Sequence, residues 1–149
     1  MAIQRQFRRV RDELAPRTGN RDSESRRRRR RDAWYRRVVA FSRTLGTRSF
    51  VTTEWVLAEF LAFYSAAGEV TRQRAAAKTR EILQDPRIQV LSPSQALFLD
   101  GLALYESRLD KQYSLTDCIS MHVMRREGLT DVLTNDHHFT QEGFRILFG

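Results

Sequence analysis

Three acidic residues stand in contexts where they could do chemistry together. Glu59 lies in the apolar stretch WVLAEFLAFY, Asp117 lies at the start of a predicted helix, and Asp136 follows a short predicted strand. Carboxylate oxygens suit Mg²⁺ or Mn²⁺, and no spacing of Cys and His in the chain suits zinc. An ion held in this way can orient a water nucleophile and offset the charge of a phosphodiester in its transition state. If the three acids converge, the chemistry is hydrolysis of nucleic acid.

Each acid also has an ordinary structural interpretation. The helix around Glu59 is apolar on almost every side and is expected to be buried, so Glu59 could pair with an arginine. Ser114 to Asp117 match the capping-box pattern, in which the acid accepts a hydrogen bond from the backbone N–H of the cap residue. Asp136 could form an Asx turn. The sequence alone leaves these alternatives open.

The neighbouring histidine and cysteine residues are interpreted as structural. His137 and His138 are adjacent and need not point the same way, so they are interpreted as turn or surface residues rather than zinc ligands. Cys118 is interpreted as a small apolar packing residue on an inner helix face. A single cysteine forms no internal disulfide, which agrees with a reducing compartment.

Helices and strands alternate along the part of the chain that must position the acids. Parallel strands separated by helices too long for hairpins predict an α/β sandwich, in which ligands bind beyond the carboxyl ends of the strands. The predicted strands are 50–53, 88–91, 132–134 and 144–147, and the predicted helices are 32–45, 54–67, 70–84, 92–109 and 114–127.

The basic character of the chain is confined to its first quarter. Residues 1–37 hold 14 arginines against five acids, whereas residues 38–149 hold 12 basic and 13 acidic residues. Residues 1–31 have few apolar positions and end in the run Arg26–Arg31, so they are expected to form a disordered tail before a domain at 32–149. Phosphate affinity is one interpretation of this tail, and a solvated tail without function is the other.

Two stretches of the sequence resemble the PIN-domain family, specifically VapC-type toxins of toxin–antitoxin pairs. They are FVTTEWVLAEFLAF at 50–63 and DKQYSLTDCISMHVMRREGLTDVLTNDHHFTQEGFRIL at 110–147. The resemblance implies a three-layer α/β/α sandwich around a parallel sheet and an endoribonuclease that uses Mg²⁺ or Mn²⁺. It also implies a homodimer and a cognate antitoxin protein.

The family's functional residues can be placed on this sequence through these stretches. The resemblance puts three catalytic, metal-binding acids at Glu59, Asp117 and Asp136. It makes Thr116 and Thr134 candidates for hydrogen bonding the acids or a water at the metal. The capping and metal-binding interpretations of Asp117 are compatible, because its two carboxylate oxygens can face different partners.

The N-terminal end departs from the family pattern. The family begins with an apolar central strand that carries a first acid, and the nearest match here is Asp22–Ser23, which has no apolar neighbours. The central strand could therefore be absent, which would leave strand edges unpaired, and the activity could be impaired by loss of the first acidic ligand. A frameshift or misplaced start in the coding sequence would explain residues 1–31.

Two functions remain in competition at this stage. The first is an RNA-cleaving toxin, and the alternative is a catalytically inactive PIN-fold protein that binds RNA or the antitoxin. A DNA-acting nuclease of the same fold is a further alternative. No stretch is long and apolar enough to span a membrane or to serve as a secretory signal, so a cytoplasmic protein is expected.

Overall fold

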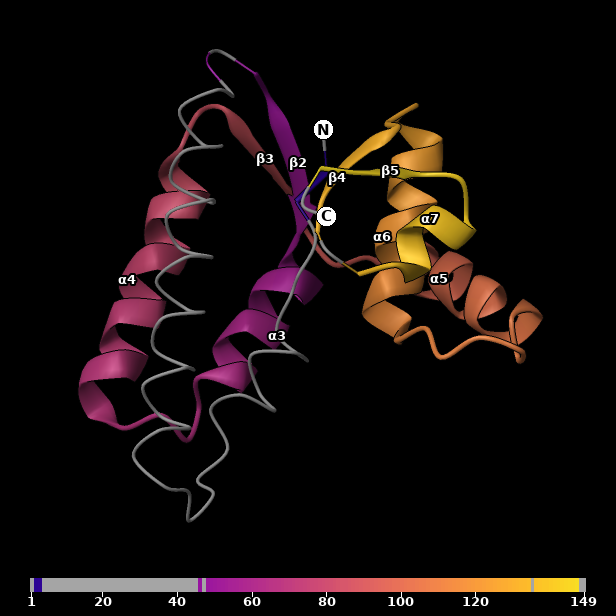
Figure 1. Ribbon diagram of the computed structural model, residues 1–149. Helices are drawn as coiled ribbons and strands as arrows, with labels where there is room; N and C mark the ends of the chain where they lie inside the picture. Colours follow the sequence, from indigo (N-terminus) through magenta and orange to yellow (C-terminus); the bar gives the residue numbers. More distant parts are fainter. Residues whose placement is uncertain (1, 4–45, 47, 135, 148–149) are drawn as a thin grey trace, which may run out of the picture. The chain divides into compact units, whose positions relative to one another are not determined.

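The computed structural model describes residues 2–3, 46, 48–134 and 136–147. The chain divides into two compact units, Met1–Phe7 with Ser49–Gly149 and, separately, Arg8–Arg48. All the elements described below belong to the first unit (Figure 1). The expected helix at 32–45 and most of the arginine-rich tail fall outside the described residues. The domain boundary at residue 32 and the disorder of the tail therefore stay predictions.

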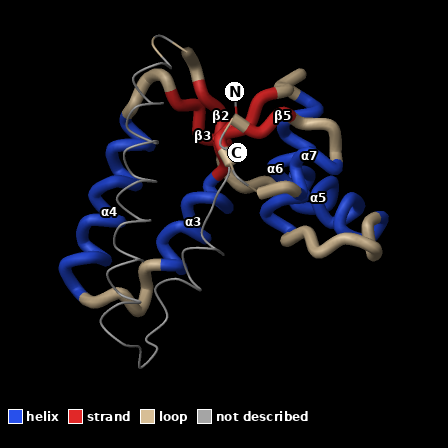
Figure 2. The backbone as a smooth tube through the Cα atoms, in the orientation of Figure 1, coloured by secondary structure: helices blue, strands red, loops and turns tan. Residues whose placement is uncertain are grey.

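A parallel sheet lies between two groups of helices in this unit. Figure 2 shows α3 and α4 on one side of the strands and α5, α6 and α7 on the other. All neighbouring strands that the structure describes are parallel. The α/β sandwich expected from the sequence is confirmed. The strand order is β3 (Ile88–Leu91), β2 (Phe50–Thr53), β1 (Ala2–Ile3), β4 (Asp131–Leu133) and β5 (Arg145–Ile146).

The central position of the sheet is occupied by β1. Ala2 pairs with Val51 on one side and with Val132 on the other, and Ile3 pairs with Leu133. A central strand is therefore present at Ala2–Ile3, contrary to the expectation that it could be absent. A two-residue strand next to polar residues leaves no apolar run in the sequence, so pattern reasoning had no signal for it.

Helix α3 (Glu54–Phe63) follows β2 without an intervening loop. The Oγ1 atom of Thr53 caps it by accepting a hydrogen bond from the backbone N–H of Val56, at 3.4 Å. Val56 and Leu57 are buried, but Leu61 is 39% exposed, so the expectation that this helix is buried on all sides is wrong. Helix α3 packs against α4 (Glu69–Gln84), and this packing leaves Leu61 partly exposed.

Helices α5 (Gln95–Ser107) and α6 (Leu115–Arg126) pack closely against each other. A Cβ atom added to Gly101 of α5 would lie 2.3 Å from Cγ1 and 3.1 Å from Cα of Ile119 in α6. Ile119 is fully buried, so it has little room to move. Gly101 therefore permits the close approach that holds the N-terminal half of α6 in place.

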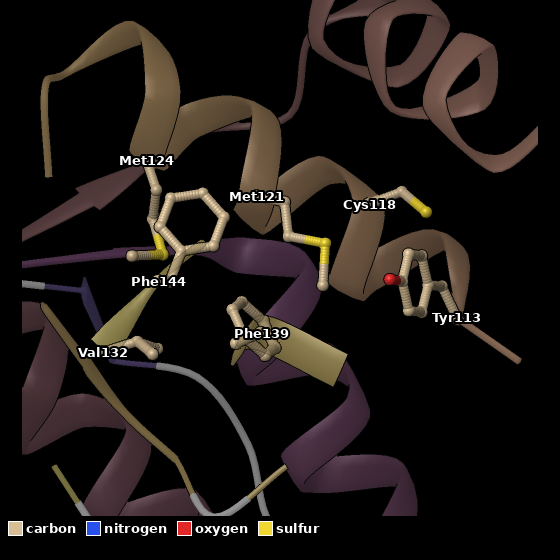
Figure 3. Close-up of a cluster of buried hydrophobic side chains, with 7 residues drawn as sticks. All are labelled: Tyr113, Cys118, Met121, Met124, Val132, Phe139 and Phe144. Carbon is tan, nitrogen blue, oxygen red and sulfur yellow. The ribbon is translucent and has the colours of Figure 1, made fainter. Parts of the chain in front are cut away.

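The core beside α6 is built from aromatic, sulfur-containing and β-branched side chains. Figure 3 shows Met121 and Met124 of α6 facing Phe139, Phe144 and Val132. Met121, Met124, Val132 and Phe139 have no exposed surface. Phe139 belongs to the short helix α7 (His138–Gln141), for which the sequence predicted no element. Burial of Phe139 fixes α7, and with it the segment after β4, against α6.

Most expected elements agree with the structure apart from their ends. The helix expected at 54–67 ends at Phe63, and the helix expected to reach 109 ends at Ser107. The strand expected at 144–147 is limited to Arg145–Ile146. Within the described residues, no helix has both the length and the apolar character needed to cross a membrane.

Candidate metal centre

Asp117 is held at the first turn of α6 by a capping box. Its Oδ2 atom accepts hydrogen bonds from the backbone N–H of Ser114 at 2.9 Å and from the Ser114 hydroxyl at 2.7 Å. The hydroxyl of Ser114 in turn accepts from the backbone N–H of Asp117 at 3.1 Å. The capping interpretation is confirmed. These bonds to Oδ2 hold the carboxylate in one orientation.

Asp136 is held by an Asx turn at the end of the segment that follows β4. Its Oδ1 atom accepts a hydrogen bond from the backbone N–H of His138 at 3.0 Å. Its own backbone N–H donates to Oγ1 of Thr134 at 3.1 Å, and Thr134 is fully buried. The Asx-turn interpretation is confirmed, and the turn is anchored from both sides.

The structure brings Asp117 and Asp136 together with His138. One ligand atom from each of the three residues lies within 4.8 Å of the other two. Two carboxylates at this separation repel each other unless a cation or a proton lies near them. The N-terminus of α6 supplies partial positive charge at Asp117. A divalent cation would neutralise the negative charge that remains on the two carboxylates.

Glu59 does not join these atoms at the same spacing. It is half-buried on α3, and among the described residues the group within 4.8 Å contains only Asp117, Asp136 and His138. Its assignment as a metal-binding and catalytic residue stays a prediction. The roles expected for Thr116 and Thr134 in the reaction also stay predictions, although Thr116 is buried beside Asp117 and Thr134 binds the backbone of Asp136.

The two adjacent histidines have different environments. His137 is exposed and precedes the first residue of α7. The side chain of His138 is 24% exposed, and its Nδ1 atom lies 3.2 Å from Oδ1 of Asp136. Within the described part of the chain, that Nδ1 atom is buried and has no hydrogen-bond partner. His138 takes part in the Asx turn, as expected, but most of its side chain is buried.

An ion-pair network around the buried side chain of Glu142 supports the side of the cluster formed by α7. The Glu142 side chain is 4% exposed, and its Oε1 atom accepts from Nε of Arg108 at 2.8 Å, while Arg125 donates to Oε2. The hydroxyl of Tyr113 lies 3.2 Å from the same Oε1 atom. Arg108, at the end of α5, holds the pKa of Glu142 below its usual value, with help from Arg125 at the end of α6 and from Tyr113. These pairs tie the C-terminal ends of α5, α6 and α7 together.

Tyr113 connects this network with the candidate metal centre. Its ring meets the ring of His138 edge to face, with 5.1 Å between the centroids. Burial, followed by the hydrogen bond with Glu142, raises the pKa of Tyr113 to about 12. The hydroxyl therefore stays protonated at neutral pH and bonds to Glu142 while the ring orients His138.

Cys118 lies next to Asp117 but takes no part in the cluster. It has no exposed surface and belongs to the core, as expected from the sequence. Burial, and after it the charge of Asp117, raises the pKa of its thiol to about 11. A buried, protonated thiol is a poor nucleophile and a poor metal ligand. Cys118 is therefore part of the packing that supports Asp117.

The donor set fits the divalent ion that the family resemblance implies. Two carboxylates can bind Mg²⁺ or Mn²⁺ while water completes the coordination. The buried Nδ1 atom of His138, without a hydrogen-bond partner in the described chain, is the kind of polar atom that an ion would satisfy. Asp117 and Asp136, oriented by Ser114 and Thr134, are the residues that would hold it.

A family model described as PIN domain matches residues 22–144. The chain belongs to the PIN domain family. The match begins ten residues before the expected domain start at 32, at Asp22, which lies outside the described residues. The PIN domain resemblance noted in the sequence is thus confirmed, and the cluster of Asp117, Asp136 and His138 lies within the matched range.

A solved structure of a toxin shares the PIN domain fold. It is VapC20 of Mycobacterium tuberculosis, described as a sarcin–ricin loop cleaving toxin. The two chains are 22% identical with a TM-score of 0.57, over 65% of this chain and 72% of that chain. A likeness at this identity establishes the fold alone. The comparison with curated proteins gave no match.

His138 was not predicted as a member of the cluster. The sequence Asp-x-His carried a partial signal, because an Asx turn at Asp136 brings the backbone N–H of His138 to its carboxylate. Two adjacent histidines without cysteines match no zinc pattern, so the sequence offered no reason to assign His138 to a metal. The helix α7, which fixes the ring of His138, gave no periodic pattern because it has four residues.

Proposed function

We propose that this PIN-domain chain is a VapC-type endoribonuclease, the toxin of a toxin–antitoxin pair, which depends on Mg²⁺ or Mn²⁺. The observation that carries the proposal is the gathering of Asp117 and Asp136 with His138, within 4.8 Å, in a chain of this family. The description of VapC20, a protein of similar fold, as a toxin that cleaves the sarcin–ricin loop favours RNA as the substrate class.

The residues of the chain would act mainly by holding charge in place. Asp117 and Asp136 would bind the ion, and Glu59 would supply a further carboxylate from α3. When bound, the ion would orient a water nucleophile and offset the charge of the phosphodiester in the transition state. Ser114 and Thr134 keep the two aspartates oriented before RNA arrives, so less reorganisation is needed during the reaction.

Protein partners follow from the same proposal. A toxin of this type would be inhibited by a cognate antitoxin and would form a homodimer. Four exposed apolar residues of α5 and the segment after it offer surface for one of these contacts, namely Phe98, Leu99, Tyr105 and Leu109. Light scattering of the full chain, with and without antitoxin, would measure both associations.

A second candidate is a catalytically inactive PIN-fold protein that binds RNA or antitoxin. One observation that favours it is that no acidic residue follows β1 closely, since the first acid in the sequence is Asp12. The other is the presence of 14 arginines in residues 1–37. Arginines outside a cleavage site would bind phosphates in a salt-dependent way. Under this alternative the chain would bind RNA and leave it intact.

Incubation with structured RNA distinguishes the two candidates. The full chain is expected to cut RNA when Mg²⁺ or Mn²⁺ is added and to stop when a chelator removes the ion. Intact RNA under all metal conditions, with binding that disappears when the run Arg26–Arg31 is replaced by serines, would support the inactive module. Replacement is preferable to truncation, because removal of residues 1–31 would also remove β1.

A further inference from the structure

His138 differs in chemistry from the acidic residues that were predicted to bind the metal, because it offers a nitrogen atom. Its Nδ1 atom is 3.2 Å from Oδ1 of Asp136, yet no hydrogen bond joins them. Oδ1 already accepts the backbone N–H of His138 at 3.0 Å. The Nδ1 atom is therefore a buried nitrogen beside a carboxylate oxygen that is already used in the turn, and both atoms have lone pairs that a cation could accept.

The surroundings hold the imidazole ring in this position. Tyr113 meets the ring edge to face, and its hydroxyl is tied to Glu142. Phe139, the next residue, is fully buried and fixes the backbone of α7. A ring held by packing on one side and by the Asx turn on the other loses little further freedom on binding an ion. The Nδ1 atom is thus held beside Asp136, in a residue that groups with Asp117.

We infer that His138 is a third ligand of the divalent ion, through Nδ1, and that this makes the site a mixed nitrogen–oxygen site that prefers Mn²⁺ to Mg²⁺. The inference rests on the proposed function for the presence of the ion. Mg²⁺ strongly prefers oxygen ligands and keeps most of its water, whereas a transition-metal ion accepts imidazole nitrogen readily. Replacing an oxygen ligand by Nδ1 therefore shifts the preference toward Mn²⁺.

Pulsed electron paramagnetic resonance of Mn²⁺ bound to the full chain tests the inference without any activity measurement. The wild type is expected to show coupling of Mn²⁺ to an imidazole nitrogen. His138→Phe keeps an aromatic ring against Tyr113 and removes the nitrogen, so the coupling is expected to disappear. His137→Phe is the matched control and is expected to keep it. The remaining histidine, His122, lies on α6 with its Nε2 atom 3.2 Å from Oδ2 of Asp100 on α5, and it is not a member of the group of Asp117, Asp136 and His138.

A titration of Mn²⁺ and Mg²⁺ measures the preference. His138→Phe is expected to weaken Mn²⁺ binding by about tenfold or more and to change Mg²⁺ binding much less. A wild type that binds Mg²⁺ as tightly as Mn²⁺ would contradict the inferred preference. A His138→Phe variant that folds, as judged by circular dichroism, and binds Mn²⁺ like the wild type would overturn the assignment of His138. His138→Gln, which lacks the imidazole but keeps a polar side chain, repeats the test if the Phe variant does not fold.

Failure of this inference and failure of the proposed function give different results. If Asp117→Asn abolishes Mn²⁺ binding while His138→Phe leaves it intact, the carboxylate site stands and only His138 is wrongly assigned. If the wild type binds neither ion, both the inference and the metal-dependent nuclease are wrong.

Discussion

At the scale of single residues, Asp117 and Asp136 each have a structural task, to which the proposed function adds metal binding. Asp117 closes a capping box through Oδ2, and Asp136 closes an Asx turn through Oδ1. The same contacts that make these residues look ordinary in the sequence hold their carboxylates near each other. A capping pattern is therefore no argument against a catalytic role for the acid that completes it.

Conversion of Asp117 to Asn should separate these two tasks. The amide oxygen can still accept the backbone N–H of Ser114, so stability should change little, while the negative charge is lost. RNA cleavage is expected to fall by about a hundredfold or more, because metal stabilisation of the transition state is worth several kcal/mol. Gel assays of cleavage, with thermal unfolding alongside, provide the measurement. Asp110→Asn, at an exposed acid, is the matched control and should cut like the wild type.

The single cysteine offers a direct probe of the packing behind Asp117. With a pKa of about 11, roughly a thousandth of Cys118 is thiolate at pH 8, and the side chain has no exposed surface. The thiol is expected to react with a disulfide reagent at least about a hundredfold more slowly in the native protein than in denaturant. Equal rates in the two states would show that α6 is not packed as described.

At the scale of the elements, the packing of α5 against α6 depends on one glycine. Gly101→Ala would normally favour a helix by about 1 kcal/mol, but here the new Cβ atom would lie 2.3 Å from a side-chain atom of Ile119. The variant is expected to lose about 1–3 kcal/mol in the free energy of unfolding, because the fully buried Ile119 cannot yield. Urea denaturation measures this value. An unchanged or increased stability would mean that the two helices are farther apart.

The network around Glu142 should make stability depend on pH. Because Arg108, Arg125 and Tyr113 lower the pKa of Glu142 in the folded state, its contribution is complete above its ordinary value of 4.5 and is lost as the pH falls through the lower folded value. Glu142→Gln is expected to cost about 2 kcal/mol at neutral pH, and this difference should shrink below pH 4.5. Urea denaturation of both proteins across this range gives the comparison. A difference that stays constant with pH would contradict the network.

Elements with a strong periodic pattern were predictable from the sequence, and the shortest were not. The pattern of α6 and its cap gave the position of Asp117. The two-residue β1 and the four-residue α7 form because their neighbours hold them, through strand pairing of Ala2 and burial of Phe139. Such contacts are between distant parts of the sequence and leave no local pattern.

At the scale of the whole molecule, β1 links the two halves of the sheet. It pairs with β2 through Ala2 and with β4 through Ala2 and Ile3. Replacement of both residues by proline removes backbone donors from these ladders and is expected to lower the free energy of unfolding by about 2–4 kcal/mol. Replacement of both by valine keeps the donors and should leave stability close to that of the wild type. Equal stability of the proline and valine variants would show that the sheet does not need β1.

The family and its fold could be predicted from two stretches of sequence, whereas the group of Asp117, Asp136 and His138 could be predicted only in part. Asp117 and Asp136 were placed correctly together because both lie at fixed positions relative to regular elements. The position of Glu59 relative to them depends on how α3 packs, and that of His138 on a turn followed by a short helix. The residue spacing within a single segment of the sequence predicts neither of these two positions.

Crystals of the full chain soaked with Mn²⁺ give the most direct measurement of the central claim. An anomalous difference map at the manganese absorption edge should show a peak bounded by Asp117, Asp136 and His138, and no such peak at this position in Asp117→Asn crystals. A wild-type map without a peak between these residues, or with manganese bound only elsewhere, would contradict the metal centre and the nuclease proposed from it.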